Sequence, residues 1–265
     1  MKLYWIDAFA DRPFTGNPAG VVPLDAWPAD PLMQQIAFEN GLAETAFFVR
    51  TGDARFHLRW FTPAVEVDLC GHATLASAFV VFHHLGQPGE RITFDSRSGP
   101  LHVARRADGL LELDFPARPA QPVATADPPP ALLHSVDRQP TAWLKVATHP
   151  YYLAVYPSQA DVLAVRPDFA RLATLGDTRL IVTAPGEGCD CASRFFAPGA
   201  GVPEDPVTGS AHCTIVPYWA ARLGRTELHA RQVSRRGGDL FCTLAGDRVR
   251  LAGRACLYLQ GTLHL

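Results

Sequence analysis

Glu44 is a first candidate for chemistry, because its carboxylate stands at the mouth of the otherwise apolar segment 44–49. Burial raises the pKa of a carboxyl group and suits it to taking up and returning a proton. Buried acids are rare, so the competing interpretation is an exposed carboxylate at a strand edge or a cap. Glu44 is therefore a candidate general acid/base whose role depends on its neighbours.

Cys70, Gly71 and His72 place a thiol, a flexible residue and an imidazole at the start of an apolar, helix-compatible run. The dipole at a helix amino terminus lowers the pKa of a thiol and disfavours a charged imidazole, so we expect a neutral His72 that exchanges a proton. The competing interpretation makes Cys70 a small core residue and His72 a partner of the helix cap.

A second constellation occupies residues 203–212, where Asp205 precedes a proline and then Thr208, Gly209 and Ser210. The proline biases Asp205 to an extended conformation, so its carboxylate projects from a loop that enters a helix. Asp205 is either a second acid/base group or an N-terminal cap, and Thr208 equally fits an ordinary N-cap. Gly209 and Ser210 offer backbone N–H groups and a hydroxyl where a substrate carboxylate fits.

Other motifs are weak or missing. Cys189 and Cys191 lack the companion pair or histidine spacing of a zinc site, so we read them as a surface loop and expect no metal. The chain contains no phosphate-cradling glycine motif of the common types and no serine-hydrolase elbow. Nucleotide and serine-hydrolase chemistry therefore have no support in the sequence.

The chain contains an internal repeat. The matching pairs of segments are 59–63 with 194–198, 71–78 with 209–216, and 96–99 with 234–237. Ser96 follows Gly71 by 25 residues, and Ser234 follows Gly209 by the same 25 residues. Chance similarity rarely preserves both order and spacing, so the repeat indicates two similar halves.

The elements that must position these residues follow from local patterns. Runs of β-branched and aromatic residues predict strands at 2–9, 44–50, 55–61, 91–96, 100–105, 110–115, 142–147, 151–156, 179–184, 193–197, 239–245 and 248–253. Helices are expected at 30–41, 71–85, 167–174 and 210–223, the last kinked by Pro217. Short connections predict mostly antiparallel strands.

The proline-rich stretch 116–130 predicts a boundary between two domains, 1–118 and 119–265. Each half carries one long helix with almost no charge, which should be buried all round. The expected class is α+β, with two pseudo-symmetric domains. Two helix amino termini facing one another across an inter-domain cleft would suit an anion.

Composition points to a globular protein that binds small molecules. The 265 residues are 48% hydrophobic and 19% charged, and 24 basic side chains nearly balance 26 acidic ones. Such a balance gives no support for nucleic acid or an acidic membrane surface as a partner. An early acid, Asp7, interrupts any signal-peptide core, and no apolar run is long enough for a membrane span. We expect a soluble, cytoplasmic protein whose six cysteines are reduced.

Taken together, these motifs resemble the PhzF family of phenazine-biosynthesis isomerase-like proteins, which share the diaminopimelate epimerase fold. The resemblance covers essentially the whole chain. It is carried by DAF at 7–9, FTGNPAGV at 14–21, ETAF at 44–47, RWFTP at 59–63, CGHAT at 70–74 and EDPVTGSA at 204–211.

The resemblance implies two domains, each a curled, mostly antiparallel sheet around a central helix, with the active site between them and a homodimer as the usual assembly. It also implies that Glu44 is the general acid/base that moves a proton between carbons of a small cyclic amino-carboxylic acid. The pocket around it would be lined by the residues matching His72, Asp205, Gly71, Gly209, Ser210 and Asn17. No cofactor is implied.

Sister enzymes of this fold, diaminopimelate epimerase and proline racemase, use one thiol from each half. Here the first half has Cys70, whereas the second-half motif offers Asp205 and carries Cys213 only further into the helix. A cofactor-independent isomerase using Glu44, His72 and Asp205 is therefore the main hypothesis. An epimerase or racemase of an amino-acid derivative that uses Cys70, and a non-catalytic small-molecule binding protein, remain as alternatives.

Overall fold

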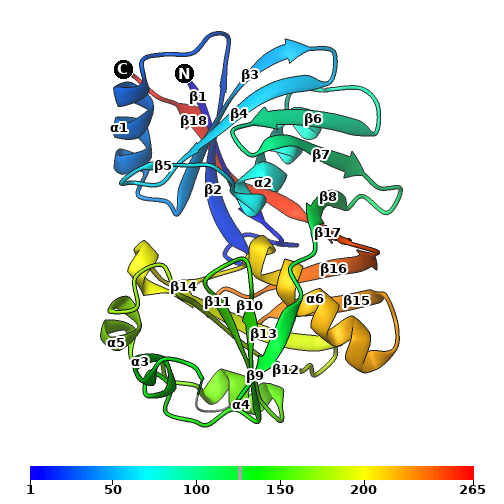
Figure 1. Ribbon diagram of the computed structural model, residues 1–265. Helices are drawn as coiled ribbons and strands as arrows, with labels where there is room; N and C mark the ends of the chain where they lie inside the picture. Colours follow the sequence, from blue (N-terminus) through cyan, green and yellow to red (C-terminus); the bar gives the residue numbers. More distant parts are fainter. Residues whose placement is uncertain (125–126) are drawn as a thin grey trace. The chain divides into compact units, whose positions relative to one another are not determined.

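The computed structural model describes residues 1–124 and 127–265, and the chain forms two compact units (Figure 1). Unit 1 comprises Met1–Asp114 with Ala252–Leu265, and unit 2 comprises Phe115–Leu251. Unit 1 thus includes a carboxyl-terminal segment that the sequence alone places with the second half.

The proline-rich stretch 116–130 lies near the start of unit 2, and its residues 125 and 126 are outside the described residues. The stretch is not only a connection. Ala120–Val123 forms strand β9, which pairs with β10 (Ala142–Val146) despite the proline at position 122.

Unit 1 consists of strands around two helices. Its elements are β1 (Lys2–Ala8), β2 (Asn17–Leu24), α1 (Asp30–Asn40), β3 (Glu44–Gly52), β4 (Arg55–Phe61), β5 (Glu66–Val67), α2 (Gly71–His83), β6 (Arg91–Ser96), β7 (Gly99–Arg105) and β18 (Ala255–Thr262). The chain passes between the units within β8 (Leu111–Pro116) and β17 (Arg248–Gly253).

Unit 2 has the same kind of organisation. Besides β9 and β10, its elements are α3 (Pro130–Leu133), β11 (Tyr151–Val155), α4 (Gln159–Ala164), α5 (Phe169–Ala173), β12 (Arg179–Pro185), β13 (Cys191–Ala197), the 3₁₀ turn Pro198–Ala200, β14 (Val202–Asp205), α6 (Gly209–Leu223), β15 (Glu227–Gln232) and β16 (Gly238–Ala245).

The strand pairing repeats between the units. In unit 1, β2 and β3 are parallel, β3 and β4 antiparallel, β4 and β5 antiparallel, and β4 and β6 parallel. In unit 2 the same sequence of directions joins β11 with β12, β12 with β13, β13 with β14, and β13 with β15. The remaining described pairs with printed registers are antiparallel. The expected α+β class, the duplication and the mostly antiparallel pairing are therefore confirmed.

The two long helices are the buried centre of each unit, as the lack of charge predicts. In Figure 1, α2 lies beside the strands of unit 1, where it contacts β1, β2 and β3, and α6 contacts β15 and β16 in unit 2. Residues 73–78 and 211–216 are fully within the core. Among the described residues, no helix combines the length and the apolarity that a membrane span requires.

Helix α6 continues through Pro217, although the sequence predicts a kink there. Proline has no N–H, so the carbonyl of Cys213, one turn earlier, loses its usual helical donor. The backbone N–H of Arg118 donates to that carbonyl at 2.8 Å. The connection between β8 and β9, which contains Arg118, therefore compensates for the proline.

The sequence patterns do not predict several of the strands, because the residues of these strands are not typical strand formers. β2 carries Pro18 and Pro23, which are poor strand formers but lie near the two ends of the strand. β18 is mostly exposed, and β15 alternates polar with apolar residues over most of its length. Pairing with distant segments, and not residue preference, makes these stretches strands.

Candidate active site

Glu44 is positioned by the tight exit from α1 into β3. Gly41 ends α1 with a φ of 61°, and its N–H donates to the carbonyls of Ala37 and Phe38. A positive φ is strained for residues with a side chain, so glycine allows the chain to reverse there. β3 then begins at Glu44, which lies opposite Ala19 of the parallel strand β2.

His72 and Cys70 come from the amino terminus of α2. Cys70 is the extended N-cap residue, and the N–H and Oγ1 of Thr74 both donate to its carbonyl oxygen. Nε2 of His72 lies 3.2 Å from Oε2 of Glu44, and Sγ of Cys70 lies 3.4 Å from Nδ1 of His72. The imidazole therefore stands between the carboxylate and the thiol.

The contact between Glu44 and His72 is an ion-pair contact that lacks hydrogen-bond geometry. Both atoms, Oε2 and Nε2, are buried and have no hydrogen-bond partner among the described residues. The side chain of Glu44 is 17% exposed and that of His72 is 6% exposed. A buried polar atom without a partner is costly, and such atoms gather where a ligand or a reacting group is bound.

The pKa values differ from the sequence expectation. Burial, and then the charge of Glu44, raises the pKa of the Cys70 thiol to about 11. Burial lowers the pKa of His72, but its neighbours Cys70 and Glu44 outweigh burial and hold it well above the ordinary value. The prediction of a lowered thiol pKa and a neutral imidazole is therefore wrong, because tertiary neighbours exceed the effect of the helix dipole.

Asn17 is fully buried at the start of β2, opposite Ala8 of β1. The loop before it is fixed by the buried carboxylate of Asp7, whose Oδ2 accepts a hydrogen bond from the N–H of Phe14 at 3.0 Å. Asn17 and Glu44 are therefore the first residues of β2 and β3, the two neighbouring strands that form a parallel pair in unit 1.

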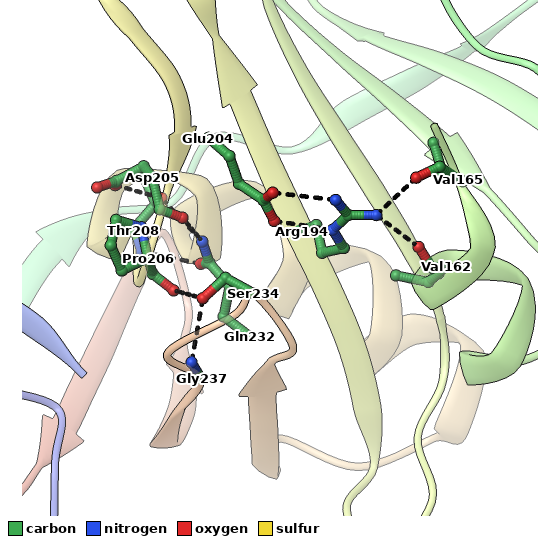
Figure 2. Close-up of polar contacts among 10 residues, drawn as sticks. All are labelled: Val162, Val165, Arg194, Glu204, Asp205, Pro206, Thr208, Gln232, Ser234 and Gly237. Carbon is green, nitrogen blue, oxygen red and sulfur yellow. Dashed lines mark hydrogen bonds and ion pairs between the residues drawn. The ribbon is translucent and has the colours of Figure 1, made fainter. Parts of the chain in front are cut away.

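In unit 2, Asp205 belongs to a rigid polar network (Figure 2). Oγ1 of Thr208 donates to Oδ2 of Asp205 at 2.5 Å, and Nε2 of Gln232 donates to the Asp205 carbonyl at 2.6 Å. The N–H of Thr208 donates to Oε1 of Gln232 at 2.8 Å. Ser234 continues the network by donating to the carbonyl of Pro206. The loop that enters α6 is thus held on both sides.

This network bears on the capping roles that the sequence leaves open at 203–212. Thr208 occupies the N-cap position of α6, but its side chain makes no cap hydrogen bond and instead donates to Asp205. Asp205 lies four residues before Gly209, the first residue of the helix, and is not its cap. Gly209 starts α6 within the core, and Ser210 follows it in a partly buried position.

Sequence reasoning missed two residues beside Ser210. The hydroxyl of Tyr151 lies 3.1 Å from Oγ of Ser210, and Nη1 of Arg179 donates to the Tyr151 hydroxyl at 3.2 Å. The internal repeat contained a signal for Arg179. Arg194 follows Arg59 by 135 residues, and Arg179 follows Glu44 by the same 135 residues.

One group of donor atoms could hold a metal among the residues that the structure describes. The thiol of Cys70, the imidazole of His72 and the carboxylate of Glu44 lie within 4.8 Å of one another. Zinc binds such ligands, but it requires a thiolate, and burial opposes ionisation of Cys70. Cys189 and Cys191 do not belong to this group, and all six cysteines are free thiols, as expected.

Comparisons with known proteins agree with the resemblance. A family model described as phenazine biosynthesis-like protein, PhzC-PhzF, matches residues 6–261. A Pseudomonas aeruginosa protein named as an uncharacterized isomerase is 50% identical over 273 residues, which cover 100% of this chain and 99% of the relative.

Solved structures agree with the fold. The crystal structure of a PhzF-family phenazine biosynthesis protein from Enterococcus faecalis has a TM-score of 0.93 at 40% identity, covering 100% of this chain and 99% of that one. A probable proline racemase from Agrobacterium radiobacter is 11% identical and has a TM-score of 0.62, and the match covers 100% of this chain and 93% of that one. At this low identity the similarity shows a common fold and nothing about activity. Because the family model spans almost the whole sequence and a relative is half identical over its full length, the chain belongs to the phenazine biosynthesis-like, PhzC-PhzF family.

Proposed function

We propose that the chain is a cofactor-independent isomerase in which Glu44 moves a proton on a small, carboxylate-bearing substrate. The isomerase class is supported by the family and by the names of its relatives. The single observation that carries the mechanism is the contact of 3.2 Å between Oε2 of Glu44 and Nε2 of His72, two buried atoms that have no hydrogen bond among the described residues.

The proposed step begins with Glu44 as an ionised base. Its carboxylate takes a proton from an activated carbon, so a C–H bond breaks and its electron pair shifts into the substrate. The same carboxyl group then returns the proton to another carbon, where a new C–H bond forms. No net oxidation or loss of atoms occurs. Such positioned general acid/base groups contribute about a hundredfold or more to a rate.

His72 is proposed to be the charged partner of the Glu44 carboxylate between turnovers. The raised pKa of His72 favours an imidazolium, whose charge stabilises the carboxylate of Glu44 at 3.2 Å. When Glu44 takes up a proton, the imidazolium loses its partner, and this promotes return of the proton to carbon. His72 thereby acts on the substrate through Glu44.

Residues that bind substrate are proposed from the family resemblance. They are Asn17, Gly71, Gly209 and Ser210, and Asp205 is proposed as a second acid/base group. Backbone N–H groups at a helix amino terminus favour an anion, and each well-placed donor contributes roughly 3 kcal/mol to stabilising developing charge. The hydrogen bond from Thr208 to Asp205 supports a carboxylate that is fixed in position.

The test is proton exchange into carbon in deuterium oxide, followed by NMR with a panel of small cyclic and acyclic amino acids and hydroxy acids. Glu44→Gln keeps the shape of the side chain but removes the base. We expect a loss of at least about a hundredfold in exchange, with ligand binding kept. The matched control is Glu39→Gln, which changes an exposed glutamate of α1. Unchanged exchange in Glu44→Gln would refute the proposal.

A second candidate is an epimerase or racemase in which the thiol of Cys70 exchanges the proton. Its specific support is the distance of 3.4 Å between Sγ of Cys70 and Nδ1 of His72. The raised pKa of Cys70 opposes it, because only roughly one thiol in ten thousand would be ionised near pH 7. Exchange that survives a chelator but disappears in Cys70→Ser would favour this candidate. Binding of a carboxylate without any exchange would favour a binding protein.

A further inference from the structure

The two units place different chemistry at the same three topological positions. In unit 1, Glu44 is the first residue of β3, Ala19 lies opposite it on the parallel strand, and His72 is the second residue of α2. In unit 2, the corresponding residues are Arg179 at the start of β12, Tyr151 opposite it, and Ser210 as the second residue of α6.

The strand register supports this correspondence independently of the repeat in sequence. Thr45, which follows Glu44, pairs with Phe61 of β4, and Leu180, which follows Arg179, pairs with Phe196 of β13. Phe61 and Phe196 stand at matching positions of the repeated segments 59–63 and 194–198. A carboxylate and an imidazole in unit 1 are therefore matched by a guanidinium, a phenol and a hydroxyl in unit 2.

The cluster of Arg179, Tyr151 and Ser210 is rich in donors. Nη1 of Arg179 donates to the Tyr151 hydroxyl, since a guanidinium has no acceptor. The contact of 3.1 Å between Tyr151 and Ser210 uses one hydroxyl hydrogen, whichever residue supplies it. The other hydroxyl hydrogen has no acceptor among the described residues, so the cluster as a whole presents a donor.

Arg179 carries a further hydrogen-bond donor that has no acceptor among the described residues. Its Nε is buried and has no hydrogen-bond partner within the described part of the chain. Its exposed partner is Asp177, which accepts from Nη2 at 2.8 Å and is 66% exposed. Such an exposed ion pair contributes little, because solvent screens it. Tyr151 itself is only 2% exposed, so the cluster is part of the packed structure and not a chance grouping of surface side chains.

We propose that Arg179, Tyr151 and Ser210 form a carboxylate-binding cluster that makes the protein select anionic over neutral ligands. A guanidinium and a hydroxyl donor match the planar, acceptor-only carboxylate group. The backbone N–H groups at the start of α6 add further hydrogen-bond donors, which also carry partial positive charge. The assignment of this carboxylate to the substrate rests on the proposed function, and it names Arg179 and Tyr151 as specificity-determining residues.

The test compares acids with their neutral amides by isothermal titration calorimetry. The probes are benzoate with benzamide, and cyclohexanecarboxylate with its amide. We expect the wild-type protein to bind at least one acid about tenfold or more tightly than its amide, as a charged hydrogen bond allows. Arg179→Met should abolish this preference, whereas Arg179→Lys, which keeps the charge, should retain part of it.

Two further variants keep the test independent of folding. Tyr151→Phe keeps the ring but removes the hydroxyl, and it should weaken acid binding by about threefold to tenfold. Arg171→Met removes an exposed arginine of α5 and should leave the preference unchanged. Melting temperatures close to the wild-type value establish that each variant is folded.

The inference fails if no acid is preferred over its amide, or if a folded Arg179→Met variant binds acids as the wild type does. This failure is distinct from failure of the proposed function. Acid binding that is insensitive to Arg179→Met, with exchange lost in Glu44→Gln, overturns the cluster and keeps the isomerase. Acid binding lost in Arg179→Met, with exchange unchanged in Glu44→Gln, supports the cluster and overturns the proposed isomerase mechanism.

Discussion

Oε2 of Glu44 lies 3.2 Å from Nε2 of His72, although 28 residues separate them and they belong to a strand and a helix. The contact joins the first residue of β3 to the first turn of α2 inside unit 1. Both atoms are buried, and the pKa of His72 is held above its ordinary value. The carboxylate that is proposed as the base therefore lies against a cation that stabilises it.

His72→Gln should lower carbon exchange by about tenfold or more, because the cationic partner 3.2 Å from the Glu44 carboxylate is removed. The sign of the pH effect follows from the raised pKa of His72. The imidazolium persists above pH 6.5, so wild-type activity should fall only as the pH rises through the raised value, and the variant should lack this limb. Rate–pH profiles measure it, with His134→Gln, an exposed histidine, as control. An identical alkaline limb in His72→Gln would contradict this role.

Cys70→Ser should retain exchange within about threefold of the wild type, because a buried thiol with a pKa near 11 supplies almost no thiolate at neutral pH. The small change reflects lost packing and not lost chemistry. Initial rates of deuterium incorporation measure it, and the conservative variant Cys213→Ser provides a comparison in the second buried helix. A collapse of the rate in Cys70→Ser alone would instead favour the thiol mechanism.

His212 should make the protein sensitive to acid. Burial lowers the pKa of its imidazole to about 4, while Nδ1 lies 2.8 Å from the Thr208 carbonyl. The folded pKa is lower than the unfolded one, so the contribution of the neutral His212 to stability is full above pH 6.5 and declines as the pH falls towards 4. The loss should approach about 3 kcal/mol. Urea unfolding at several pH values measures the slope.

The matched variants for this prediction are His212→Gln and His134→Gln. The first should flatten the decline between pH 6.5 and 4, whatever its effect on stability at neutral pH. The second changes an exposed histidine and should keep the wild-type slope. Parallel curves for His212→Gln and wild type would contradict the prediction.

Arg194→Met should destabilise the loop that carries Asp205. In Figure 2, the Arg194 guanidinium pairs with both carboxylate oxygens of Glu204, and its Nη1 donates to the carbonyls of Val162 and Val165. Removing one partner of a largely buried pair costs about 3 kcal/mol, because the other charge remains. Urea unfolding followed by tryptophan fluorescence measures this loss.

The double variant Arg194→Met with Glu204→Gln separates charge from packing. Neutralising Glu204 should recover part of the lost stability, since the unpaired charge is gone. Arg171→Met, which breaks an exposed pair with Asp168, should cost less than about 1 kcal/mol. Equal losses in Arg194→Met and Arg171→Met would show that the Arg194 pair contributes no more than a surface pair.

The class of fold, the duplication and the buried helices are predictable from the amino-acid sequence alone. Repeated order and equal spacing carry the duplication, and the absence of charge in residues 73–78 and 211–216 predicts burial without any partner being named. Glu44 and His72 are visible in sequence because each stands at the boundary of an apolar run. Local pattern suffices for these features, since burial of an element depends mainly on its own residues.

Features that depend on pairing between distant segments become visible in the folded chain and not in the sequence. β18 is a strand because it pairs with β1 across almost the whole chain, not because of its own residues. Tyr151 and Arg179 meet through the parallel register of β11 and β12, which no local pattern specifies. The pKa of His72 rises, against the helix dipole, because Glu44 and Cys70 lie against its ring. Neighbouring groups shift a pKa when they lie within a few ångströms in space, and the number of residues between two positions in the sequence does not give that distance.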